Sequence, residues 1–133
     1  MSILAPTDRD ADRDAHLEAA LVAALPTDVD YASARLVTER SEALSVRRGE
    51  LEPVVNGFDR GVMITVWHQG GLGYGATGDL SPAGLAAAVD AARHWARRTA
   101  GYGMLDDVPL GHGVGSYASP VQTPWTPDLG GRI

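Results

Sequence analysis

Cysteine is absent from the 133 residues of the sequence. Its absence excludes disulfide bonds, thiolate zinc ligands and a thiol nucleophile, and it is typical of proteins in the reducing cytoplasm. Cations are also scarce, with 11 Lys plus Arg against 17 Asp plus Glu and a net charge of -6. This balance disfavours phosphate backbones and anionic lipid as partners. We therefore expect a cytoplasmic protein with no nucleic-acid and no membrane partner.

Long apolar runs are missing as well. No stretch approaches the roughly 18 apolar residues that a membrane-spanning helix needs, and the N-terminus turns acidic at Asp8 without a signal-peptide core. Apolar residues nevertheless make up 44% of the sequence and charged residues 21%, which is enough for one globular core. The 16 glycines and 8 prolines divide this chain into zones.

The first zone predicts a helix that begins in an acidic turn and ends at Pro26. Its buried stripe is expected to comprise Leu17, Ala20, Leu21, Ala24 and Leu25. The preceding acidic residues, Asp8, Asp10, Asp12 and Asp14, complement the positive end of the helix dipole. A calcium loop is the alternative, but Arg13 stands where such a loop needs Gly and Ala19 where it needs Glu. The acidic run is therefore interpreted as a helix start.

Between residues 29 and 76, apolar and polar residues alternate, which predicts antiparallel strands joined by turns. Turn signals fall at residues 47–50, at Asn56-Gly57 and at residues 69–71, and Pro53 suits a short edge strand over 51–55. The strand over 61–68 is apolar on both faces. We expect it at the centre of the sheet and covered on both sides, with the second cover supplied from outside this chain.

A second helix is predicted to begin at Ser81-Pro82, because Ser caps free amides and Pro at the first helical position gives up an amide without a partner. Its buried stripe is Leu85, Ala88, Val89, Ala92 and Ala96. The basic residues Arg93, Arg97 and Arg98 suit the carbonyl end of this helix, which stops at Gly101.

These zones predict an α+β fold, in which an antiparallel sheet of about four to five strands carries two helices, one before and one after the strands. Residues 1–101 form this domain. Residues 102–133 form a Gly/Pro-rich linker or arm, whose few large side chains can dock on a surface but cannot build a core. These side chains are Tyr117, Val121 and Trp125.

No recognisable active site emerges from the motifs. Residues 73–78 spell Gly-x-Gly-x-x-Gly, but no βαβ unit surrounds them, so the glycines are interpreted as serving turns and a closely packed strand. None of the four histidines lies next to Glu or within helical reach of another His, so local spacing gives no zinc site. These histidines are His16, His68, His94 and His112.

Three segments do form a collinear pattern. The first carries Ser41-Glu42 and the turn Val46-Arg47-Arg48-Gly49, the second is the loop Gly57-Phe58-Asp59-Arg60-Gly61, and the third runs from Gly73-Tyr74-Gly75 to Asp79-Leu80-Ser81-Pro82. In order and spacing they resemble the N-terminal domain of the TldD/PmbA family of zinc metallopeptidases, formerly described as modulators of DNA gyrase. The resemblance covers residues 31–99.

The resemblance implies a cytoplasmic peptidase that hydrolyses unfolded peptides as a homodimer or as a heterodimer of two paralogues. It also implies a zinc ion held by a His-Glu-x-x-x-His helix and a distant Cys. The present sequence has no His-Glu pair and no Cys, so no metal ligand or catalytic residue carries over and the chain is expected to be inactive alone. What carries over is a lobe that packs on the catalytic domain and helps to enclose the peptide channel or the dimer interface.

Two functions remain open. The chain is either the non-catalytic N-terminal portion of such a peptidase, as a fragment, a split gene product or a truncated chain, or a stand-alone protein-binding module without hydrolytic activity. The candidate interaction residues are the loop Asp59-Arg60-Gly61 and the aromatic residues Trp67 and Tyr74. The alternative is that Asp59 and Arg60 only finish a turn and that the aromatic side chains belong to the core or to cross-strand pairs.

Overall fold

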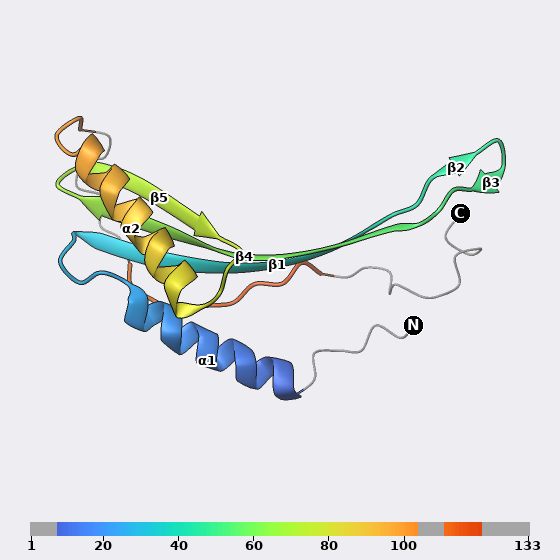
Figure 1. Cartoon of the computed structure of the whole chain (residues 1–133), viewed down its shortest axis with the longest axis horizontal. Helices are drawn as coiled ribbons and strands as arrows, with labels where there is room; N and C mark the ends of the chain where they lie inside the picture. The colour runs from blue at the N-terminus through green and yellow to red at the C-terminus, as the bar shows by residue number, and fades with distance from the viewer. Residues whose placement is uncertain (1–7, 104–110, 121–133) are drawn as a thin grey trace.

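The computed structural model describes residues 8–103 and 111–120, with side chains from residue 14 onward. Its elements follow in the order α1 (Asp8–Ala24), β1 (Tyr31–Ala43), β2 (Val46–Arg47), β3 (Glu50–Leu51), β4 (Val55–His68), β5 (Gly71–Thr77) and α2 (Pro82–Thr99). An antiparallel sheet has the strand order β1-β4-β5, and β2 pairs with β3 in a separate ladder. The predicted α+β fold, with helices before and after the strands, is confirmed (Figure 1).

The central strand β4 sorts its side chains onto two faces, because successive residues of a strand point to opposite sides. Val62, Ile64 and Val66 belong to the buried core together with the inner residues of α2. Met63 and Trp67 lie on the opposite face, which neither described helix covers (Figure 1). The prediction that 61–68 is central is thus confirmed, but within the described residues only one of its faces is covered by helices.

Small residues bring α2 very close to β5. A Cβ placed on Gly73 would lie 1.9 Å from the carbonyl oxygen of Ala92, and Gly71 and Gly75 approach Ala96 and Ala88 in the same way. The three alanines are one helical turn apart and almost fully buried. The glycines of β5 therefore serve a close approach of strand and helix, as the sequence predicts.

The ends of α2 also follow the prediction. Ser81 takes an extended conformation and its hydroxyl accepts a hydrogen bond from the Gly84 N–H at 3.2 Å, with Pro82 in the first helical position. At the other end Gly101 has φ of 81°, the left-handed conformation that Gly adopts at helix ends. Thr99 ties this end to the sheet, because its hydroxyl and the backbone of Leu72 exchange two hydrogen bonds of 2.9 Å.

The first helix contributes less to the core than the sequence predicts. Leu21 is buried, and Leu17, Ala24 and Leu25 pack against the core in part. Ala20 is exposed, so its assignment to the buried stripe is wrong. The stripe of α1 is narrower because this helix lies beside the β1 edge of the sheet (Figure 1), where a single row of side chains reaches the core.

The strands β1 and β4 continue beyond the end of β5 as a long two-stranded extension. Residues 37–43 of β1 pair with 55–61 of β4, whereas β5 pairs only with residues 62–68. We call this extension the ribbon; it projects away from the helices towards β2 and β3 (Figure 1).

The ribbon corrects three sequence predictions. Asn56-Gly57 is not a turn and Asp59-Arg60-Gly61 is not a loop, because β4 begins at Val55 and runs through all of these residues. The predicted strand over 51–55 is not one strand, since Leu51 ends β3 and Val55 begins β4. The chain reverses earlier, at Arg48 and Gly49, with φ of 55° and 81°. Cross-strand pairing with β1 overrides the local turn preference of Asn-Gly.

Residues 111–120 contain neither helix nor strand and are exposed, Tyr117 included. One contact with the sheet is present there, since the His112 ring lies 5.8 Å from that of Tyr31. Val121 and Trp125, predicted to dock on a surface, lie outside the described residues. Neither α1 nor α2 is long and apolar enough to cross a membrane.

Candidate functional site

The five candidate residues do not converge on one point. Asp59, Gly61 and Trp67 lie on the uncovered face of β4, and Tyr74 lies on the same face of β5. Arg60 lies on the other face, towards the helices. The candidates therefore divide between a broad surface and a helix contact.

The face of the three-stranded sheet opposite the helices is rich in aromatic and apolar side chains, and the segment 111–120 reaches it where the His112 ring lies 5.8 Å from that of Tyr31. We call it the open face, and it comprises Tyr31, Ser33, Arg35, Met63, Thr65, Trp67, Leu72, Tyr74 and Ala76. Tyr31 and Trp67 are direct cross-strand neighbours with ring centroids 5.8 Å apart. Tyr74 is 53% exposed and Met63 37%. A sheet face facing water is usually polar, so this composition suits contact with another protein surface.

Arg60 fastens α1 to the central strand. Its guanidinium donates a hydrogen bond to the Asp14 carboxylate and forms an ion pair with it, while the Arg60 side chain is only 28% exposed. The Nε of Arg60 is buried and has no hydrogen-bond partner among the described residues. These contacts give Arg60 a structural role on the helix side, separate from the open face.

Asp59 lies directly opposite Glu39 of β1, on the face of the ribbon that continues the open face. Both carboxylates are exposed. Since like charges directly opposite each other in a sheet are unfavourable, this pair leaves the ribbon with a local negative field.

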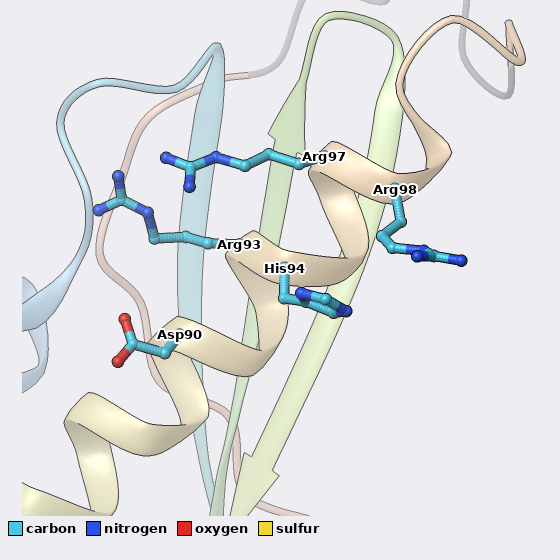
Figure 2. Close-up of a pocket in the computed structure, with 5 residues that line it drawn as sticks. All are labelled: Asp90, Arg93, His94, Arg97 and Arg98. Atoms are coloured by element: carbon cyan, nitrogen blue, oxygen red, sulfur yellow. The ribbon is translucent and has the colours of Figure 1, made fainter.

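Cations gather instead on the outer surface of α2. A shallow depression there is lined by Asp90, Arg93, His94, Arg97 and Arg98. Figure 2 shows Arg93 and Arg97 pointing to one side of the helix and His94 and Arg98 to the other. Arg93 is already paired with Asp28 at 2.6 Å. The cluster does not converge on a ligand, and the favourable position of cations near a helix C-terminus accounts for it.

The described residues do not fit the zinc ion that the family resemblance implies. Among residues 14–103 and 111–120, no three His, Asp or Glu side chains lie close enough together to hold a metal. The four histidines are spread over α1, the end of β4, α2 and the segment 111–120. No catalytic step can therefore be assigned to these residues.

One carboxylate has a perturbed acidity. The backbone N–H of Ser81 donates to the Asp79 carboxylate at 2.9 Å, and this bond, with a contribution from the Ser81 side chain, lowers the pKa of Asp79. The Asp79 N–H in turn donates to the Thr77 hydroxyl at 3.0 Å. Asp79 is thus held ionised at neutral pH in the turn that leads into α2, where it has a structural role.

Sequence reasoning did not single out Tyr31 or Glu39. Both become significant only through the register of β1 on β4, which places Tyr31 beside Trp67 and Glu39 beside Asp59. The ion pairs of Asp14 and Asp28 were also not predicted, because each carboxylate binds an arginine that lies far away along the sequence.

The comparison with protein families gives one match. Residues 32–96 match the model of the PmbA/TldA metallopeptidase domain 1. The matched segment begins in β1, includes every later strand and ends within α2. No curated protein matches the chain.

Proposed function

Residues 32–96 are a domain 1 of the PmbA/TldA metallopeptidase family, and from this premise we propose that the chain is a non-catalytic lobe of such a peptidase. In this role the chain packs on a zinc-bearing catalytic domain and helps to enclose the peptide channel or the dimer interface. The substrates of the assembled peptidase are unfolded peptides. The family match over the sheet and α2 is the observation that carries the proposal.

The open face supports this proposal as the surface of contact. The two described helices pack on one side of the sheet, and the other side presents Tyr74, Met63 and the Tyr31–Trp67 pair. Full burial of one large apolar side chain contributes about 1.5–3 kcal/mol, so a few such residues supply enough for a specific contact. We infer that the catalytic domain covers this face.

Sedimentation velocity tests the proposal directly. The chain is mixed with the zinc-bearing polypeptide of the PmbA/TldA family encoded in the same genome, and a complex is expected to sediment faster than either component. Peptide hydrolysis by the zinc-bearing polypeptide should change when the chain is added. A chain that neither binds this partner nor alters its activity would contradict the proposal.

The alternative is a stand-alone binding module. It predicts a complex with a protein that has no peptidase activity and no effect on hydrolysis. A metal assay adds a further check, because stoichiometric zinc in the purified chain would place the metal site in these residues and overturn the non-catalytic role.

A further inference from the structure

Among the described residues, no strand lies beside one edge of β4 in the ribbon. β5 pairs with residues 62–68 and stops, so residues 55–61 have β1 on one side only. The Trp67 carbonyl accepts a hydrogen bond from Asp30 on the β1 side. The N–H and C=O groups of successive residues in an antiparallel strand point to opposite edges. Odd-numbered residues of β4 therefore direct these groups towards β1, and even-numbered residues direct them away from β1.

The unpaired edge is therefore formed by the backbone groups of Asn56 and Phe58, which we call the free edge. The free edge ends at Arg60, where the chain leaving β5 lies beside β4: a Cβ on Gly78 would lie 3.7 Å from the Arg60 carbonyl oxygen. An isolated two-stranded ribbon is marginally stable in water, and this one also exposes Val55 and Phe58 by more than 60%. These features suit the addition of a further strand from a partner.

The two faces of the ribbon differ in charge. On the helix side the Arg40 guanidinium lies 5.7 Å from the centre of the Phe58 ring, and Arg60 is paired with Asp14. On the opposite face Glu39 and Asp59 face each other. Within the described residues, neither carboxylate has a cation or hydrogen-bond donor in contact, so their charges remain uncompensated.

The residues on either side of Asp59 limit where a further strand can lie. Gly57 and Gly61 flank Asp59 on the same face of β4. The chain leaving β5 already lies beside Gly61, where an added Cβ would lie 3.1 Å from the Thr77 carbonyl oxygen, so a further strand can extend along β4 only from Asp59 towards Val55. Such an edge fits an extended segment that places one cationic side chain opposite Asp59.

We propose that the free edge of the ribbon binds an extended peptide segment that carries a Lys or Arg paired with Asp59 and Glu39. A second copy of the chain fits this edge poorly, because antiparallel pairing of two β4 edges about Phe58 brings two such carboxylate pairs together on chains of net charge -6 each. The inference goes beyond the proposed function and does not depend on it, since the ribbon edge and the open face are different surfaces.

Fluorescence anisotropy at low ionic strength tests the charge preference. The probe is a fluorescein-labelled peptide of sequence Thr-Val-Thr-Lys-Thr-Val-Thr, and its matched control has Glu in place of Lys. The full chain should bind the Lys peptide more tightly, and added salt should reduce the difference. Asp59→Asn and Glu39→Gln should each weaken binding of the Lys peptide by about two- to fivefold, the range of exposed ion pairs. Glu50→Gln, in β3, should leave binding unchanged.

A proline tests the backbone contact. Asn56→Pro removes an N–H that points to the free edge and that the ladder with β1 does not use. Binding of both peptides should then be lost, while circular dichroism shows that the fold is retained. Equal binding of the two peptides by the native chain, or unchanged binding by folded Asn56→Pro, would overturn the proposal. A dimer of the chain alone that Asn56→Pro dissociates would also overturn it, by assigning the edge to a second copy. None of these results bears on the complex with a zinc-bearing partner.

Discussion

Replacing Gly73 by alanine tests the close packing of β5 against α2. The added Cβ would lie 1.9 Å from the Ala92 carbonyl oxygen and 2.5 Å from the Ala96 nitrogen, and both are backbone atoms that no rotamer change can move. To relieve the shortest contact, strand and helix must separate by about 1.5 Å. That separation loosens Ala92, Ala96 and Val66, which are fully buried.

The expected loss follows from two opposing effects. Overpacking of a core costs about 1–3 kcal/mol and occasionally more. Alanine at an unstrained glycine position offsets this by about 0.4–1 kcal/mol, through the lower entropy of the unfolded chain. We therefore expect Gly73→Ala to lower the free energy of unfolding by about 2 kcal/mol, which corresponds to a drop in Tm of roughly 8–16 °C in a domain of this size.

Urea and thermal unfolding followed by circular dichroism measure this loss, and Gly57→Ala is the matched control. Gly57 lies in a strand as well, β4, but its Cβ would meet only the Ser41 side chain, whose hydroxyl can rotate away. The control should be neutral or slightly stabilising. If Gly73→Ala proves no less stable than Gly57→Ala, the close packing of β5 on α2 is refuted.

Two further predictions concern the joints around the sheet. The pKa of Asp79 is lowered on folding, so the stability that its ionised form contributes is present at neutral pH and is lost as the pH falls through the lowered pKa. The difference in Tm between the native chain and Asp79→Ala should therefore be constant above pH 5 or so and shrink below pH 4 or so. Arg60→Ala should lower the free energy of unfolding by no more than about 1 kcal/mol, yet it should speed amide hydrogen exchange in α1. Unchanged exchange in α1 would show that the ion pair with Asp14 does not hold this helix.

The parts of the fold that local chemistry determines were predictable from the sequence. The cap at Ser81, the stop at Gly101 and the buried stripe of α2 each depend on residues within a few positions of one another. The same holds for the turn at Gln69 and Gly70, which have φ of 50° and 74°. In these places local preference and the final structure agree.

The errors arose where the register of distant strands decides the outcome. Asn56-Gly57 is a strong turn signal by itself, but in the structure it lies opposite Ser41 and Glu42 in a continuous ladder. Asp59-Arg60-Gly61 became part of the same strand, which moved Arg60 to the helix side and Asp59 to the opposite side. No local pattern specifies how far β1 and β4 continue past β5, so the ribbon and its free edge became visible only in three dimensions.

The candidate site was predictable in part. Alternation within β4 and β5 correctly separates Trp67 and Tyr74 from the buried row of Val62, Ile64 and Val66. It could not show that the two described helices cover the same face, since that depends on where both helices pack. The proposed role as a docking lobe depends on this difference between the two faces.

The affinity of two aromatic variants for the zinc-bearing family partner tests this role most directly. Tyr74 on the open face and Trp95 on the outer surface of α2 are exposed to nearly the same extent, 53% and 54%. We predict that Tyr74→Asp weakens the complex at least tenfold, about 1.4 kcal/mol, whereas Trp95→Asp leaves it unchanged. Equal affinities for both variants, or a loss confined to Trp95→Asp, would contradict docking through the open face.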